Sequence, residues 1–155
     1  MWLLFMKKLE EWLREEKVAP IISLGAVNPT EPGIGGEGAV FIIRGEESRG
    51  DEDVLSETRL TIYLETWVRD DSPKLQYGYE RLHLIEERVD EALKKIRHGA
   101  GALDDKYARL DGRFQLMDVC VSQKTGDLDS MRPLVGTQYT VEVMLYDTQD
   151  EEGVW

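Results

Sequence analysis

The sequence is poor in cysteine and in basic residues. Cys120 is the single cysteine of the 155 residues, which excludes an internal disulfide and a zinc site built from several cysteines. Only 19 Lys and Arg stand against 31 Asp and Glu, so the formal net charge at pH 7 is -12. Because a surface this acidic repels phosphate, we expect no sequence-specific binding of nucleic acid.

The sequence also lacks a long hydrophobic run. Its most apolar stretch covers residues 1–6 and is followed at once by Lys7 and Lys8, whereas a membrane helix needs about 20 apolar residues. Positive charge that follows the apolar residues, rather than preceding them, is not the order of a signal peptide. We therefore expect a cytoplasmic protein that does not bind membranes.

What the chain has is the composition of a globular protein, 41% hydrophobic and 32% charged. Its length suits one domain, which we place at residues 1–147, followed by an acidic and loose tail at 148–155. The predicted order is helix, strand, strand, long helix, strand, strand, with an optional short strand at 20–24. This order indicates an α+β fold, with helices packed on a mostly antiparallel sheet of four to five strands.

Apolar residues at helical spacing predict two helices. The first ends before Pro20, and its stripe fits either the chain's own sheet or a partner surface. That stripe comprises Trp2, Phe5, Met6, Leu9, Trp12 and Leu13. The second has Ser72 as its N-cap, Pro73 at its first position and Gly99 as its stop. Its buried stripe comprises Leu75, Tyr79, Leu82, Ile85, Val89, Leu93 and Ile96.

Runs of β-branched residues and strict alternation predict the strands. These strands cover residues 40–43, 58–69, 113–122 and 137–146. In the third strand, Cys120 is expected on a buried face with Phe114 and Leu116. The strand at 58–69 has one aliphatic face for the core, whereas its other face carries Tyr63 and Trp67 beside charged residues.

The aromatic face of that strand has two interpretations. It is either solvated, with its rings covered by neighbouring side chains, or part of a subunit interface, where Tyr, Trp and Arg are enriched. Together with two tyrosines of the long helix, it provides the candidate residues of an oligomer interface. These are Tyr63, Trp67, Tyr77 and Tyr79.

Two loops stand out by composition. Residues 25–38 contain two prolines and five glycines, and Gly33, Gly35 and Gly38 match the pattern GxGxxG. No strand precedes this pattern and no helix follows it, so we expect a flexible or partner-contacting loop rather than a phosphate site. Residues 44–57 are acidic and fit a solvated loop, a site for a hard cation, or an arm that faces a partner or a lumen. The candidate residues of this arm are Glu46, Glu47, Asp51, Glu52 and Asp53.

The reactive side chains form no catalytic pattern. Cys120 is expected to behave as a small buried hydrophobe. A carboxylate and histidine site for a metal is conceivable on the long helix, but the same residues fit an ordinary exposed face with ion pairs. These residues are His83, Glu86, Glu87 and Asp90. P-loop, kinase and GxSxG motifs are absent. We therefore expect no enzyme activity, no cofactor and no metal.

Four segments of the sequence carry a resemblance to a known family. They read KKLEEWLRE (7–15), ETRLTIYLETWVRD (57–70), SPKLQYGYERLHLIEERVDEALKKI (72–96) and RPLVGTQYTVEVMLYD (132–147). In element order and texture they resemble the tail terminator and tail-completion proteins of long-tailed bacteriophages, including minor structural proteins encoded by prophages.

This resemblance implies a small α+β subunit that forms a ring, usually a hexamer, with no catalysis and no cofactor. The ring would cap the tail tube and join the tail to the head, so the implied partners are further copies of the chain, tail-tube proteins and head-connector proteins. The implied location is the host cytoplasm during assembly and then the virion tail. The residues also fit a small-molecule-binding or enzymatic α+β domain, or a generic dimeric interaction module.

Overall fold

The computed structural model describes residues 1–49, 57–102 and 105–148 and has the predicted α+β fold. The elements along the chain are α1 (Trp2–Glu15), β1 (Ile21–Leu24), β2 (Ala39–Arg49), β3 (Glu57–Arg69), α2 (Leu75–Gly99), β4 (Phe114–Gly126) and β5 (Leu134–Asp147). The optional strand at 20–24 is thus present as β1. The acidic tail predicted at 148–155 lies outside the described residues, except for Thr148.

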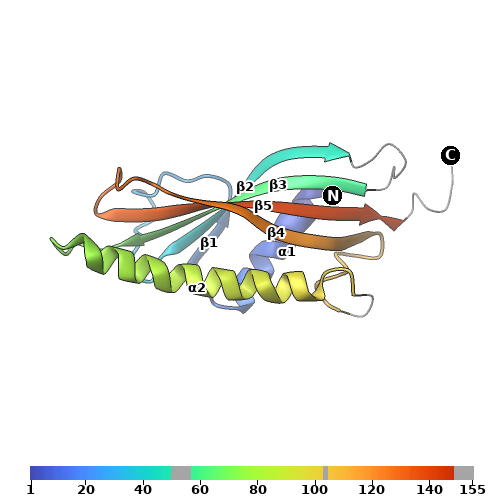
Figure 1. Cartoon of the computed structure of the whole chain (residues 1–155), viewed down its shortest axis with the longest axis horizontal. Coiled ribbons are helices and arrows are strands. Elements are labelled where there is room, and N and C mark those ends of the chain that lie inside the picture. The colour runs from blue at the N-terminus through green and yellow to red at the C-terminus, as the bar shows by residue number, and fades with distance from the viewer. Residues whose placement is uncertain (50–56, 103–104, 149–155) are drawn as a thin grey trace.

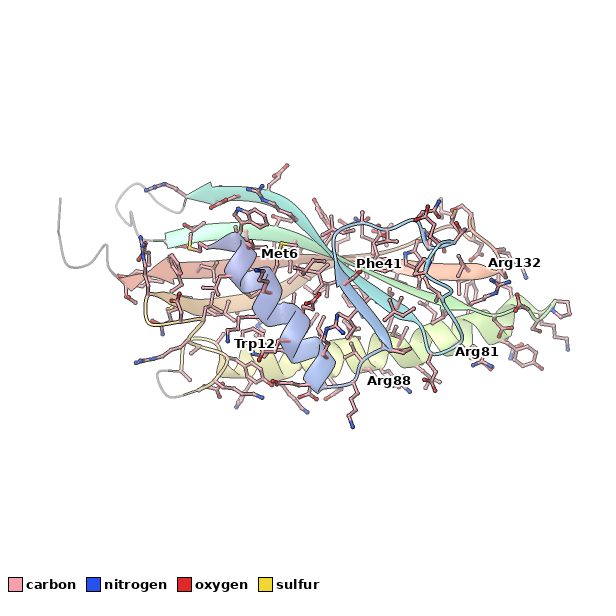
Figure 2. The ribbon with its side chains drawn as sticks, turned by 180° about the vertical axis from the view of Figure 1, so that it is seen from behind. Met6, Trp12, Phe41, Arg81, Arg88 and Arg132 are labelled. Carbon is pink, nitrogen blue, oxygen red and sulfur yellow. The ribbon has the colours of Figure 1, made fainter. Side chains whose placement is uncertain are left out.

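The strands form one five-stranded sheet in the order β1-β2-β3-β5-β4. β1 runs parallel to β2, and the other three pairings are antiparallel, so the sheet is mixed. Both helices contribute to the main core on one face of the sheet. Figure 1 shows α2 running along the length of the sheet. Figure 2, the view from the opposite side, shows α1 crossing the strands of the sheet.

Helix α1 buries the stripe that the sequence predicts. The buried residues are Phe5, Met6, Leu9, Trp12 and Leu13. The ring of Trp12 meets that of Tyr107 edge to face at 5.1 Å between centroids, a favoured arrangement for aromatic pairs. Trp2 at the start of the stripe is half-buried, and the guanidinium of Arg44 lies 3.9 Å from its ring centroid. The stripe therefore serves the chain's own core.

Helix α2 differs from its prediction at its start and in one buried position. It begins at Leu75, and Ser72 is not its N-cap: the Ser72 hydroxyl accepts a hydrogen bond from the backbone N–H of Lys74 within the preceding turn. Tyr79 is half exposed, although it was predicted in the buried stripe. Counting back four residues from Leu82 leads to Gly78, which faces Val135 of β5 and takes the buried place.

Strand β4 is longer than predicted and contains two register shifts, between Leu116 and Asp118 and between Val121 and Gln123. Each extra residue turns the following side chains to the other face. Val119 therefore joins Leu116 in the core, and Cys120 is half-buried on the opposite face. The prediction that Cys120 is buried with Leu116 is wrong for this reason. β4 continues to Gly126, beyond the predicted end of the strand at residue 122.

Strand β2 continues into the segment that was expected to be an acidic loop. Residues 44–49 pair with β3 across a register shift between Arg44 and Glu47. Glu46 and Glu47 are therefore exposed strand residues rather than loop residues. Charged side chains on a strand at the margin of a sheet are common, because they discourage unspecific pairing. The remainder of the predicted loop, residues 50–56, lies outside the described residues.

A second, smaller core lies on the face of the sheet away from the helices. There Trp67 packs with Phe41 and Leu134 beneath Ile34 of the glycine-rich loop. Only 9% of Trp67 is exposed, because the loop residues cover its ring. The loop at 25–38, predicted to be flexible or to contact a partner, folds over this end of the sheet, and Ile34 is buried.

Gly136 of β5 packs so closely on Trp67 that we expect an added methyl group at this position to destabilise the fold. A Cβ added at Gly136 would lie 2.6 Å from the Trp67 ring and 2.8 Å from the Thr66 carbonyl oxygen. We expect Gly136→Ala to lower the free energy of unfolding by about 1–3 kcal/mol, as overpacked cores do. The matched control is Gly126→Ala at the end of β4, where nothing lies within 4 Å. Urea denaturation checks both variants, and equal midpoints would contradict the close packing.

Candidate functional site

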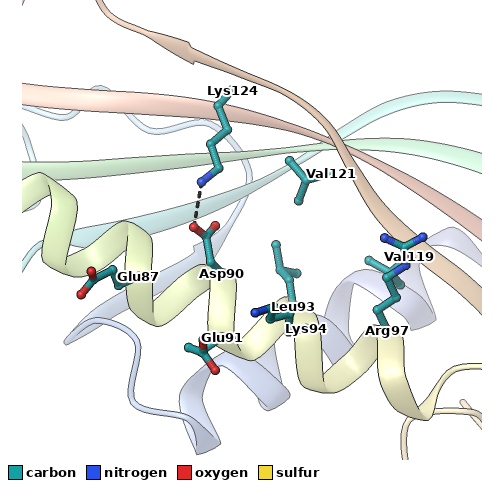
Figure 3. Close-up of a pocket in the computed structure, with 9 residues that line it drawn as sticks. All are labelled: Glu87, Asp90, Glu91, Leu93, Lys94, Arg97, Val119, Val121 and Lys124. Carbon is teal, nitrogen blue, oxygen red and sulfur yellow. Dashed lines mark hydrogen bonds and ion pairs between the residues drawn. The ribbon is translucent and has the colours of Figure 1, made fainter.

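A groove of about 600 Å³ lies between α2 and β4. Figure 3 shows its two walls, with residues of successive α2 turns on one side and residues of β4 on the other. Its apolar floor consists of Leu93, Val119 and Val121. The groove exists because the register shift in β4 turns Val119 toward the helix. Sequence reasoning missed it, since nothing in the local pattern places the shift.

The two ends of the groove differ in charge. At one end Lys94 and Arg97 project from α2. Arg97 lies 3.4 Å from Asp118, whereas Lys94 has no ion-pair partner among the described residues. At the other end, Glu87 and Glu91 line the rim. The groove therefore offers cations at one end and carboxylates at the other.

Lys124 closes the acidic end of the groove from the β4 side. Its ammonium lies 2.8 Å from Asp90 and 4.0 Å from Glu86. Burial raises the pKa of the Glu86 carboxyl above its usual value, and the Lys124 charge offsets part of this rise. The buried Tyr139 hydroxyl donates a hydrogen bond to the Glu86 carbonyl oxygen at 3.4 Å, and burial raises the pKa of this hydroxyl. These groups contact one another and do not converge on a space that a ligand could occupy.

The outer edge of β4 is open along the groove. The segment after α2 covers the start of this edge: Gly101 donates to the Leu116 carbonyl oxygen, and Leu116 donates to Ala108. From Asp118 to Gly126, no backbone hydrogen bond links this edge to another described segment. An open edge beside a groove is the arrangement to which an extended segment can add as a further strand.

The four predicted interface aromatics do not form one patch. Tyr63 is half-buried on the sheet face away from the helices, opposite Ile43 and Thr140. Trp67 lies on the same face but is buried in the second core. Tyr77 and Tyr79 are exposed on the first turns of α2, which packs on the other face.

The exposed side of α2 carries a hydrogen bond from Tyr79 and two exposed apolar side chains. The Tyr79 hydroxyl donates to the Asp129 carboxylate at 2.6 Å, and this hydrogen bond raises the pKa of the hydroxyl. Tyr79 therefore holds the turn at 127–133 to the helix. Leu84 is 52% exposed and lies two turns after Tyr77, which is 45% exposed. These two residues form an exposed apolar stripe. Tyr77 was predicted as an interface residue, whereas Leu84 was missed, although its position outside the buried stripe of the helix is a signal in the sequence.

The candidate acidic residues are only partly placed. Glu46 and Glu47 are exposed on the β2 arm, and the Glu47 carboxylate lies 3.7 Å from the Arg44 guanidinium. Asp51, Glu52 and Asp53 lie outside the described residues. The proposed cation site in this segment therefore stays a prediction.

The reactive side chains are spread apart. His83 pairs with Glu87 at 2.9 Å on the solvent side of α2, whereas Glu86 and Asp90 turn toward Lys124. Across the described ranges, no group of three or more His, Cys, Asp or Glu could hold a metal ion. The GxGxxG glycines are followed directly by a strand, β2, and not by the helix that a dinucleotide site requires.

Comparison with models of known protein families finds no match to this chain, and comparison with curated proteins also finds none. Within the described parts of the chain, neither helix has the length and apolar character that crossing a membrane requires.

Because Trp67 is buried and Tyr77 is exposed, we expect their replacement to affect stability differently. Trp67→Ala leaves a cavity beneath the glycine-rich loop, so we expect the free energy of unfolding to fall by about 3–5 kcal/mol. Tyr77→Ala removes an exposed ring, and we expect a change within about 0.5 kcal/mol. Chemical denaturation of both variants checks this. A Trp67→Ala variant as stable as the parent would show that the second core contributes little.

Proposed function

We propose that this protein is a tail terminator or tail-completion subunit of a long-tailed phage or prophage. Copies of the chain would form a ring, most simply a hexamer, that ends the tail tube and joins it to the head connector. The resemblance of four segments, which are distributed between residues 7 and 147, points to this role. The subunit would assemble in the host cytoplasm and remain in the virion tail.

The observation that carries the proposal is that the sheet has open backbone edges at both margins. β1 covers only Ala39–Ile42 of β2, and no other described strand pairs with this edge of β2 from 43 to 48. On the other margin, β4 is open from Asp118 onward. Two different open surfaces on one subunit allow a head-to-tail contact, and such contacts close into rings when the rotation between subunits permits.

The exposed stripe of Tyr77 and Leu84 supports the same role. Interfaces are enriched in exposed aromatic residues, and this stripe lies on α2 beside a hollow lined by Asp70 and Arg81. The charge of the subunit supports it as well. A ring through which DNA passes must not grip the duplex, and acidic side chains that face the lumen repel phosphate.

Solution mass tests the ring directly. We expect light scattering over a concentration and salt series to reveal a closed oligomer, with open-centred rings in negative-stain images. Tyr77→Ala combined with Leu84→Ala should lower the oligomer fraction, because the stripe is lost. Leu3→Ala, which removes a comparably exposed leucine from α1, is the control. A monomer or dimer under every condition would contradict the proposal and direct the next experiment to small-molecule ligands.

Charge reversal on the β2 arm tests which surface faces the lumen. In assembled rings, Glu46→Lys combined with Glu47→Lys should create binding to linear duplex DNA that weakens as salt rises. Glu31→Lys combined with Glu37→Lys makes the same change in net charge on the exposed part of the glycine-rich loop. Electrophoretic shift assays compare the two. Equal DNA binding by both variants would place the β2 arm outside the lumen.

A further inference from the structure

We infer that the groove between α2 and β4 binds the acidic segment 150–155 of a neighbouring copy, which adds to the open edge of β4. This inference rests on the ring proposed above and names one of its contacts. The segment reads DEEGVW. It combines carboxylates, which suit the basic end of the groove, with two apolar side chains, which suit its floor.

The chemistry of the groove fits this segment from end to end. Asp150, Glu151 and Glu152 match Lys94, which has no ion-pair partner among the described residues, and Arg97. Leu93 and Val119 of the floor are already buried, so the half-buried Val121 is the floor residue that a valine or a tryptophan would cover. Glu87 and Glu91 at the other end can accept the indole N–H of a tryptophan.

The length of the segment also fits. Six extended residues reach about 20 Å. The open edge from Asp118 to Lys124 spans a similar distance, because a strand advances about 3.3 Å per residue. The backbone of the segment can then satisfy the unpaired groups of β4, and alternate side chains can enter the groove. Charges at one end and an aromatic anchor at the other specify the direction in which the segment binds.

The last described residue of the chain, Thr148, lies away from this groove. Thr148 follows the end of β5 and is held beside the start of β4, where its N–H and its hydroxyl both donate to the Arg113 carbonyl oxygen, at 2.9 Å and 2.7 Å. The groove lies in the opposite direction, beside Val119 and Val121. The chain near Ala108, which covers the edge at Leu116, stands between them. A neighbouring copy therefore supplies the segment.

The other acidic segment outside the described residues is a poorer occupant. Residues 50–56 read GDEDVLS and also combine carboxylates with apolar side chains. They are held at both ends, by Arg49 of β2 and Glu57 of β3. Because these two strands pair with each other, little of this short segment can extend along the edge of β4 in another copy.

Paramagnetic labelling tests the contact between copies. The full chain with Gln149→Cys and Cys120→Ser carries a spin label at 149 and is mixed with an unlabelled chain whose Leu and Val methyl groups are isotopically enriched. We expect the methyl signals of Leu93, Val119 and Val121 to lose intensity in the mixed sample. Loss of intensity only when label and methyl groups share one chain would overturn the inference in favour of internal binding.

Variants of both partners sharpen the test. Trp155→Ala should weaken the association roughly thirtyfold or more, the effect typical of an aromatic anchor. Lys94→Glu with Arg97→Glu should also abolish the loss of methyl intensity, and Glu151→Lys with Glu152→Lys in the labelled chain should restore it. Lys7→Glu on the exposed side of α1 is the control. Failure of this charge-swap rescue would overturn the inferred pairing.

The inference and the proposed function fail separately. Rings that form without intermolecular loss of methyl intensity overturn the inference and leave the proposed function standing, with segment 50–56 as the next occupant to test. Intermolecular loss in a species that never closes into a ring supports the contact between segment and groove and contradicts the tail terminator role.

Discussion

The pairing of β3 with β5 is the constraint on which the rest of the structure depends. Residues 57–69 pair with residues 134–146 without a register shift, so alternate residues of both strands are fixed toward the helices. The outer pairings, of β2 with β3 and of β4 with β5, each contain register shifts. The centre of the sheet therefore determines the core. The irregular margins determine which backbone groups and side chains are left for other molecules.

Covering one face of this sheet with both helices leaves the other face to loops. The glycine-rich loop and the turn before β5 cover only the end of that face around Trp67. The middle of the face keeps half-buried residues such as Tyr63 and Cys120. The molecule thus has two surfaces suited to association, the uncovered part of the sheet and the groove beside α2, and they lie on different sides. This asymmetry suits a ring better than a two-fold dimer, whose copies present the same patch to each other.

The parts of the fold that the sequence predicts are those in which near neighbours decide the outcome. The stripe of α1 and the alternation of β3 and β5 are local patterns, and the structure confirms them. The errors arise where distant residues decide. Cys120 is turned outward by a register shift that leaves no local signal. Which cover Trp67 receives also depends on distant residues, since the loop containing Ile34 folds over it. One wall of the groove is α2, which a local pattern predicts, but the other is β4 after its register shift, which no local pattern predicts. The residues of the groove could therefore not be predicted from the sequence.

A net charge of -12 makes contact between copies depend on where the few cations lie. Repulsion between whole subunits acts at long range, and physiological salt screens it with a Debye length of about 8 Å. A partly buried contact between a carboxylate and Lys94 is screened less. Most exposed cations beside the groove are already engaged: Arg97 with Asp118, and Lys124 with Asp90. Among the described residues that line the groove, Lys94 is the one cation without an ion-pair partner. A surface that is otherwise acidic discriminates against phosphate chains. It accepts a segment whose carboxylates are followed by apolar residues.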